Sequence, residues 1–243
     1  VATLTTPDSE SLNISILTDV VLTYDVDIRN IDGTAITNAN VKNLISIYRG
    51  TYPGELLNPS FYTATISNDK KVVTIRLNPD GYYLPASEVR VVVNVVENSV
   101  GTEQTEAQSF TFTTGHYNIW KGSVDSSWSN AANWQSGYTE GASVIIDSST
   151  NGAIVNTNLS IPNLIILKGG KLTINSGMTL KVNNDFRMLS ANGSETSASL
   201  MINGTLTTVS SKTSIYQGIT DLNYDYYISS PVNGAIKSGV TPT

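Results

Sequence analysis

The sequence predicts an all-β protein: a β-sandwich over residues 1–115, then a parallel β-solenoid-like domain, or β-helix, over residues 116–243 with an aromatic cap at its N-terminal end. Three observations favour this fold class. Short segments alternate apolar and polar residues, Gly and Asn recur between the segments, and the charge of the chain changes near Gly115. Alternation at every second residue over so short a run is typical of strands that bury one face.

Six short segments between Leu159 and Val209 carry the strongest strand signal. Most of the junctions between them contain Gly or Asn, which allow the positive φ that tight corners need. Such strands can stack as rungs of a solenoid, where each buried Leu contributes about 2 kcal/mol. The spacing becomes irregular after Val182, so an antiparallel sandwich stays open as the alternative. The segments are Asn163–Leu167, Lys171–Ile174, Thr179–Val182, Asp185–Met188, Ser199–Ile202 and Thr205–Val209.

The first 115 residues contain a series of short alternating segments that are separated by turns such as Asp32-Gly33. Strands at this spacing predict a β-sandwich. Residues 38–45 predict one helical turn, because Asn is a good N-cap and the apolar residues Val41 and Leu44 share one face. The expected strands are Leu12–Ile16, Val20–Ile28, Tyr62–Ile66, Val72–Leu77, Val89–Val96 and Ser109–Thr113.

A set of motifs in this half occurs in the order found in a known family. They are Thr-Asp-Val-Val-Leu-Thr-Tyr at 18–24, Asp-Gly-Thr-Ala-Ile-Thr at 32–37, Asn-Val-Lys-Asn-Leu-Ile at 40–45, Ala-Thr-Ile-Ser at 64–67, Val-Val-Thr-Ile at 72–75 and Phe-Thr-Phe-Thr-Thr at 110–114. Over nearly all of residues 2–114 the chain resembles bacterial Ig-like domains of S-layer and large surface proteins. The resemblance implies an Ig-like sandwich that serves as a spacer or display unit, usually without catalysis.

Composition and charge narrow the classes of partner. Only 14% of the residues are charged, so the surface is built from neutral Ser, Thr, Asn and Gly, as in many extracellular β proteins. Residues 1–115 hold 13 acidic and 7 basic side chains, whereas residues 116–243 hold 7 of each. This balance argues against nucleic acid and anionic membranes as partners. There is no Cys, and no apolar run is long enough to insert into a membrane.

Four aspartates in the first half are candidate calcium ligands. Hard carboxylate oxygens in loops suit Ca²⁺, although no EF-hand spacing is present. Charged side chains on a solvated strand edge are the alternative interpretation. Calcium is the only cofactor that the sequence suggests. The candidate ligands are Asp19, Asp25, Asp27 and Asp32.

All three tryptophans of the chain, Trp120, Trp128 and Trp134, lie within 15 positions, immediately before the solenoid strands begin. Clustered indoles can form a platform on which sugars stack. They can equally cover the end of a solenoid, which would otherwise expose apolar side chains and an unpaired strand edge. The position of the cluster favours a cap, and carbohydrate binding by the three rings stays open.

A second set of motifs spans the join and the ladder. It comprises Trp-Lys-Gly at 120–122, Trp-Ser-Asn-Ala-Ala-Asn-Trp at 128–134, Val-Ile-Ile-Asp at 144–147, Leu-Thr-Ile-Asn-Ser-Gly-Met-Thr-Leu-Lys-Val at 172–182 and Asp-Tyr-Tyr-Ile-Ser-Ser-Pro-Val at 225–232. Over residues 117–209 the chain resembles modules of large secreted Bacteroidetes proteins, many of which use the type IX export route. The resemblance implies a secreted or cell-surface location in a bacterium.

The sequence lacks the groups that common catalytic sites need. The single histidine, His116, lies at the domain joint, no Ser lies in a Gly-x-Ser-x-Gly motif, and no phosphate loop is present. We therefore expect a non-catalytic, structural or adhesive fragment of a longer surface protein, which acts as a spacer and display module. Carbohydrate binding through the tryptophans and a part in a polysaccharide-degrading enzyme are the alternatives. Expected partners are neighbouring domains of the same chain and glycans or environmental surfaces.

Overall fold

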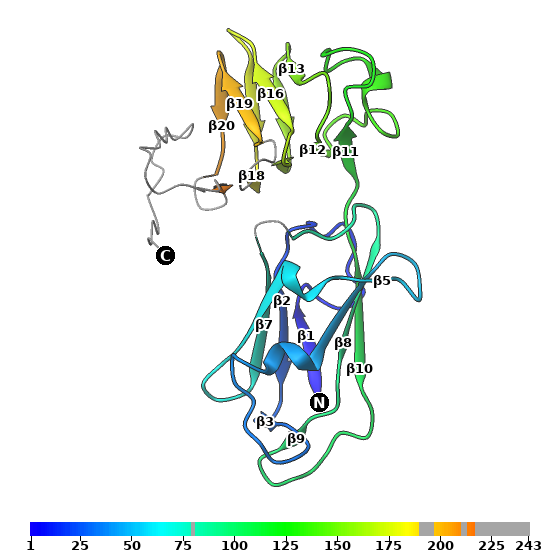
Figure 1. Ribbon diagram of the computed structural model, residues 1–243, viewed down its shortest axis with the longest axis vertical. Helices are drawn as coiled ribbons and strands as arrows, with labels where there is room; N and C mark the ends of the chain where they lie inside the picture. The colour runs from blue at the N-terminus through cyan, green and yellow to red at the C-terminus, as the bar shows by residue number, and fades with distance from the viewer. Residues whose placement is uncertain (79–80, 190–196, 210–212, 217–243) are drawn as a thin grey trace. The chain divides into compact units, whose positions relative to one another are not determined.

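The computed structural model describes residues 1–78, 81–189, 197–209 and 213–216 (Figure 1). The chain divides into two compact units, Val1–His116 and a second unit that begins at Tyr117. In the described ranges both units are built from strands, with three short 3-10 turns and no helix that could cross a membrane. The predicted all-β fold class is confirmed. The motif at 225–232 lies outside the described residues.

The first unit is an antiparallel β-sandwich of two four-stranded sheets (Figure 1). One sheet has the order β1 (Ala2–Thr6), β2 (Val20–Tyr24), β7 (Val72–Leu77), β6 (Tyr62–Ile66). The other has the order β10 (Gln108–Thr113), β8 (Glu88–Val93), β4 (Ile45–Arg49), β5 (Glu55–Leu56). A small pair, β3 (Ile28–Arg29) and β9 (Glu97–Asn98), lies at one end, and the 3-10 turns are η1 (Val41–Leu44) and η2 (Pro59–Phe61).

The core of this sandwich follows from strict alternation along its central strands. On β2 the residues Val20, Leu22 and Tyr24 are buried, and on β8 every second residue from Val89 to Val93 is buried. Each strand therefore turns one apolar face to the core and one face to solvent, as alternating side-chain directions require. The helical turn expected at residues 38–45 is present as η1.

One predicted strand of the first unit is wrong, and another is longer than the strand in the structure. The segment Leu12–Ile16 is a loop with a single bridge from Ile14 to Thr114, because Asn13 has φ 59° and breaks the extended conformation. The segment Val20–Ile28 is divided: β2 ends at Tyr24, residues 25–27 form no strand, and Ile28 begins β3, which pairs with β9. The regular register with β7 ends at Val72, which follows a turn in which Lys70 has φ 60°. Beyond it, the amides of Tyr24 and Ile28 donate to the carbonyls of Lys71 and Lys70, so residues 25–27 leave the ladder.

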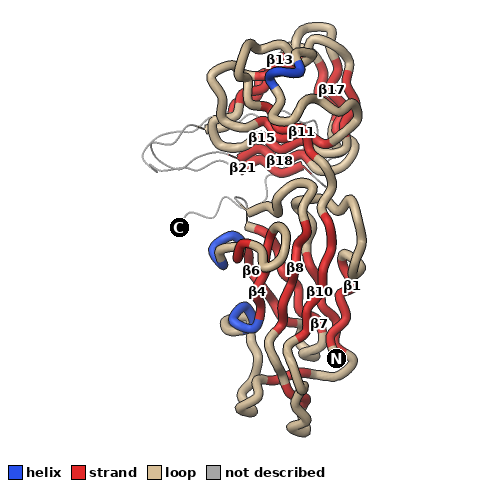
Figure 2. The backbone as a smooth tube through the Cα atoms, turned by 90° about the vertical axis from the view of Figure 1, so that its right-hand side faces the viewer, coloured by secondary structure: helices blue, strands red, loops and turns tan. Residues whose placement is uncertain are grey.

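The second unit differs from the sandwich in its strand pairing, because all of its described ladders are parallel. Figure 2 shows β15, β18 and β21 side by side in this unit. Successive coils add one strand to each of three sheets, over about four turns. The first sheet contains β11 (Tyr117–Trp120), β12 (Ser143–Ile146), β15 (Leu164–Ile166), β18 (Phe186–Leu189) and β21 (Thr213–Tyr216). The second contains β13 (Ala153–Val155), β16 (Lys171–Ile174) and β19 (Ser199–Ile202), and the third contains β14 (Leu159–Ile161), β17 (Thr179–Val182) and β20 (Thr205–Thr207).

The interior of the solenoid is a set of apolar stacks in register. Val144, Leu164 and Phe186 occupy equivalent positions of successive coils, and each is buried. On the second sheet, Leu172 of β16 is also buried, and it lies between Ala153 and Leu200 of the neighbouring coils. The predicted parallel solenoid is confirmed, and the antiparallel alternative for this half is wrong.

Replacing Leu172 by alanine is expected to lower the free energy of unfolding of the solenoid by about 2–5 kcal/mol, because the stack around it cannot close on the lost volume. The neighbouring Thr173 points to the other face of β16 and is partly exposed. Thr173→Ala should therefore change stability by no more than about 0.5 kcal/mol. Urea unfolding followed by tryptophan emission measures both variants, and equal losses would contradict the register.

Candidate functional site

The three tryptophans come together inside the first coil of the solenoid. Trp120 ends β11 in register with Ile146, so its side chain begins the interior stack that Ile166 continues. Trp128 follows Ser127, which forms a parallel bridge with Ile154 of β13. Trp134 follows the turn η3 (Ala131–Asn133) and bridges Trp120 in the antiparallel sense. The chain thus carries all three indoles to the same end of the coil stack.

The indoles pack against one another and against the solenoid core. Ring centroids are 6.5 Å apart for Trp120 and Trp128, 5.0 Å for Trp120 and Trp134, and 4.9 Å for Trp128 and Trp134, and Tyr138 adds a further contact to two of them. Their exposed fractions are 0, 2 and 4% for Trp120, Trp128 and Trp134. All three belong to the apolar cluster that runs through the coils. The cluster therefore closes the first coil as an aromatic cap.

Burial decides what these rings can do. A sugar stacks on an exposed aromatic face, and indoles that are at most 4% exposed offer no such face in this conformation. The carbohydrate hypothesis for Trp120, Trp128 and Trp134 would require the cap to open. Two indole N–H groups are also fastened to the backbone: Trp120 Nε1 donates to the Asn151 carbonyl at 2.9 Å, and Trp134 Nε1 donates to the Trp128 carbonyl at 2.9 Å.

A network of hydrogen bonds around Asp125 and Asn133 holds the loop that carries the indoles. The Asp125 carboxylate accepts from Asn130 Nδ2 at 2.9 Å, from Asn133 Nδ2 at 2.6 Å and from the Ser127 amide at 2.8 Å. Asn133 in turn accepts from the amides of Val124 and Asp125. The hydrogen bond from Asn130, followed by those from Asn133 and Ser127, holds the pKa of Asp125 below its ordinary value.

This lowered pKa predicts acid sensitivity of the cap. A carboxyl whose pKa is lower in the folded state stabilises that state above its unfolded pKa of about 3.9, and the contribution is lost as pH falls through the folded pKa. The solenoid should therefore lose stability below about pH 4, and Asp125→Asn should reduce that pH dependence. Tryptophan-detected unfolding at several pH values measures it. Asp69→Asn, which removes a carboxyl with a lowered pKa in the first unit, is the control and should leave the slope unchanged.

The four candidate calcium ligands do not converge on a shared site. Each carboxylate has its own partner, and the residues that the structure describes include no group of three or more acidic or histidine side chains that could hold a metal ion. The hydrogen bond from the Val1 amino group lowers the pKa of Asp25, and the Thr34 hydroxyl lowers that of Asp32. The partners are Arg76 for Asp19, Val1 for Asp25, Ser99 for Asp27 and Thr34 for Asp32.

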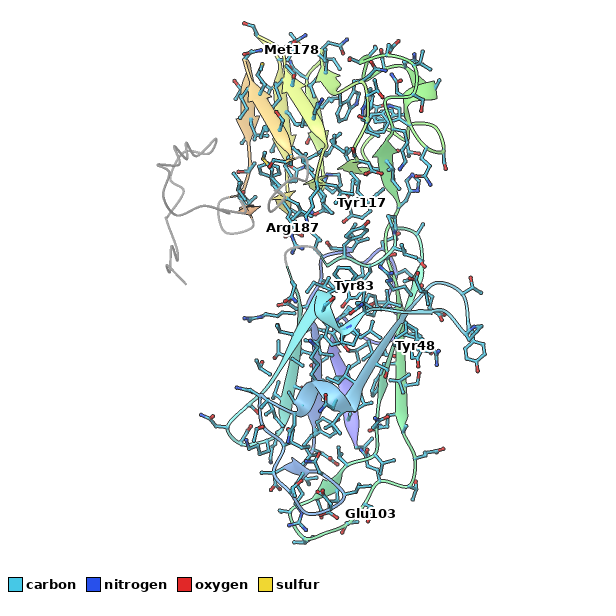
Figure 3. The ribbon with its side chains drawn as sticks, viewed as in Figure 1. Tyr48, Tyr83, Glu103, Tyr117, Met178 and Arg187 are labelled. Carbon is cyan, nitrogen blue, oxygen red and sulfur yellow. The ribbon has the colours of Figure 1, made fainter. Side chains whose placement is uncertain are left out.

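A cavity of about 520 Å³ opens at the end of the sandwich where β3 and β9 lie. Its lining includes Asp25, Glu97, Glu103 and Glu106, and Figure 3 marks Glu103 at this end. Glu97 is almost fully buried and is paired with Arg29 Nε at 2.6 Å, so its charge is already compensated. Burial also raises the pKa of Tyr24 in the lining to about 12, which keeps its phenol neutral.

The sequence interpretation missed an aromatic group on the solvent face of the sandwich. The Arg90 guanidinium lies 4.4 Å from the centre of the Tyr48 ring and 5.0 Å from that of Tyr52. Tyr52 is 75% exposed and lies in the hairpin between β4 and β5. Alternation along β4 and β8 could have placed Tyr48 and Arg90 on the outer face. The pairing of these two strands could not be read from the sequence.

Residues 119–243 match a sequence family whose description is "Domain of unknown function (DUF8693)". The chain belongs to this family. The DUF8693 match begins inside β11 and includes the three tryptophans and the described coils of the solenoid. A search of curated proteins finds no match to the chain.

Two solved structures are among those similar to the chain. CopC from Methylosinus trichosporium OB3b matches with a TM-score of 0.32 and 16% identity over 48% of this chain and 95% of that chain. Alpha-2-macroglobulin from Escherichia coli, in a structure spanning domains MG0-NIE-MG1, matches with a TM-score of 0.29 and 14% identity. The second match covers 49% of this chain and 34% of that chain.

Proposed function

We propose that the chain is a non-catalytic spacer and display module of a bacterial secreted or cell-surface protein. The observation that carries this proposal is the path of the backbone. In the sandwich the chain enters at one end and leaves at the other, so folded structure holds the segments before and after this unit apart. In the second unit each described coil carries the chain forward along the solenoid. A compact binding or catalytic domain needs no such path.

In the sandwich, the first and last strands run in the same direction. The Ala2 amide donates to the side chain of Gln108, at the start of β10, whereas Ile14 bridges Thr114, just after the end of β10. The six residues of β10 span about 20 Å. The chain therefore enters beside the β3–β9 end and leaves at the opposite end, as Figure 1 shows for this unit.

In the solenoid, each coil moves the chain forward. Parallel neighbours lie about 4.8 Å apart, so three successive coils advance by roughly 14 Å. The first coil is filled by Trp120, Trp128 and Trp134, and the later coils carry the stack from Val144 to Phe186. Because the core is continuous and the first coil is closed, we expect the solenoid to be rigid and its backbone hydrogen bonds to resist local opening.

Exchange of the sandwich within the full-length protein in its own bacterium tests the spacer role. One variant lacks residues 1–115, and a second replaces them with an unrelated β-sandwich whose termini also lie at opposite ends. Labelling of intact cells with an antibody against an epitope tag placed after residue 243 measures display. We expect display to fall in the deletion and to be restored in the exchange. Failure of the exchange to restore display would contradict the proposal.

The non-catalytic part of the proposal has its own test. Purified chain is incubated with plant and algal polysaccharides, and the release of reducing ends is measured. We expect release at the level of a heat-unfolded sample. Release that is abolished by heat and proportional to protein concentration would contradict the proposal and favour a polysaccharide-degrading enzyme.

A further inference from the structure

We propose that the outer face of the sheet β10-β8-β4-β5 binds a neutral glycan, with one hexopyranose ring stacked on Tyr52 and hydrogen-bonded by Arg90. This contact would be additional to the spacer role and does not involve the indoles of the cap. It lies wholly within the first unit.

Strand register places the components on one solvent-facing row. Tyr48 on β4 is opposite Arg90 on β8, with Leu56 of β5 on one side and Thr111 of β10 on the other. The flanking residues of β4 and β8, including Ile47 and Val91, are buried on the core side. Because side chains alternate along a strand, the row from Leu56 to Thr111 faces water.

Arg90 is held in place before any ligand arrives. Its guanidinium contacts the Tyr48 and Tyr52 rings, and its Nη2 donates to the Pro53 carbonyl at 2.8 Å, which ties the hairpin to β8. A guanidinium has five N–H donors, and stacking on aromatic rings leaves the donors at its edge free to point outward. No salt bridge involves Arg90 in the described part of the chain, so its donors are not committed to a carboxylate.

Tyr52 supplies the stacking surface. A side chain that is 75% exposed on a hairpin tip leaves most of its ring in water, although aromatic rings usually find cover in folded proteins. Arg90 and Pro53 fix the hairpin, so the ring loses little freedom when a ligand covers it. The apolar C–H face of a pyranose fits such a ring, and its equatorial hydroxyls reach the surrounding donors.

The neighbouring groups favour a neutral sugar over other ligands. Hydroxyl side chains lie beside the row: Ser46 and Ser109 flank Val92 in the adjacent outward row, and Thr111 ends the row itself. These groups exchange hydrogen bonds with sugar hydroxyls. The unit carries 13 acidic against 7 basic side chains over residues 1–115, so its field opposes a polyanionic glycan.

Affinity electrophoresis of the whole chain tests this proposal. Native gels contain one soluble neutral polysaccharide each (mixed-linkage β-glucan, xyloglucan, glucomannan or galactan), and a further gel contains polygalacturonate. We expect at least one neutral polysaccharide to retard the chain. Tyr52→Ala and Arg90→Gln should each weaken that binding about tenfold, the loss that truncation of a contact worth about 1.4 kcal/mol produces. Arg76→Gln, which removes an exposed arginine elsewhere on the sandwich, should bind as the wild type does.

Any of three results in the gels would overturn the proposal. They are no retardation by any neutral polysaccharide, retardation that Tyr52→Ala leaves unchanged, and retardation by polygalacturonate alone. A protein ligand that needs Tyr52 while no glycan binds would also overturn it, in favour of a protein interface. The exchange variant of the spacer test lacks Tyr52, so display can persist when glycan binding is lost. Failure of one proposal is therefore distinguishable from failure of the other.

Discussion

Replacing Trp120 by alanine is expected to lower the free energy of unfolding of the solenoid by about 3–5 kcal/mol. The side chain is fully buried and contacts both other indoles, and its N–H donates to the Asn151 carbonyl. Its loss removes the apolar volume that closes the first coil and exposes the stack that begins at Ile146. Urea unfolding monitored by the two remaining tryptophans measures the loss.

Three further substitutions serve as comparisons in this experiment. Val124 lies in the same loop and is 60% exposed, so Val124→Ala should cost no more than about 0.5 kcal/mol. Trp120 Nε1 donates a hydrogen bond to the backbone, whereas Trp128 Nε1 has no acceptor in the structure. Because only the first substitution removes a hydrogen bond, Trp120→Phe should lower the free energy of unfolding by about 1 kcal/mol more than Trp128→Phe does. A loss below about 1 kcal/mol in Trp120→Ala would contradict the role of this indole as a cap.

Gly122→Ala is expected to destabilise the same coil by about 2–5 kcal/mol, from roughly 1–2 kcal/mol of backbone strain and roughly 1–3 kcal/mol of overpacking. Gly122 has φ +54°, and a Cβ added there would lie 2.2 Å from the Asn151 carbonyl oxygen. That oxygen accepts the hydrogen bond from the Trp120 indole, so the clash would displace the group that holds this indole in place. The measurement is again tryptophan-detected unfolding.

Gly137 provides the matched control for this substitution. It also has a positive φ, +81°, but an added Cβ would meet no atom within 4 Å. Gly137→Ala should therefore show the backbone strain alone, about 1–2 kcal/mol. Equal losses in the two variants would mean that the close approach of Gly122 to Asn151 contributes nothing to the stability of the coil.

The solenoid could be predicted from sequence because its signal is local. Alternation around Leu172 and Leu180, with Gly and Asn between, determines which residues turn inward whatever the sheet order. The first unit shows the limit of such patterns. The expected strand Val20–Ile28 divides after Tyr24, because the regular register with β7 ends at the turn before Val72, and a single segment does not reveal its partner.

The candidate sites depended on tertiary structure in the same way. Clustered tryptophans are compatible with a platform or a cap, and only the placement of Trp128 beside β13 shows that the rings face inward. The candidate calcium ligands Asp25 and Asp32 end on separate partners because their loops lead to different hydrogen-bond donors. The pair of Tyr48 and Arg90 arises from cross-strand register, which the sequence does not encode locally.

Acrylamide quenching of tryptophan emission tests the central structural claim most directly, because all three tryptophans of the chain lie in the cap. Native protein is compared with protein unfolded in urea, with and without neutral polysaccharides. Buried indoles should give a small quenching constant that rises strongly on unfolding, and polysaccharides should leave the native emission unchanged. Native indoles that are quenched as readily as in the unfolded chain, and that respond to a polysaccharide, would contradict a closed aromatic cap.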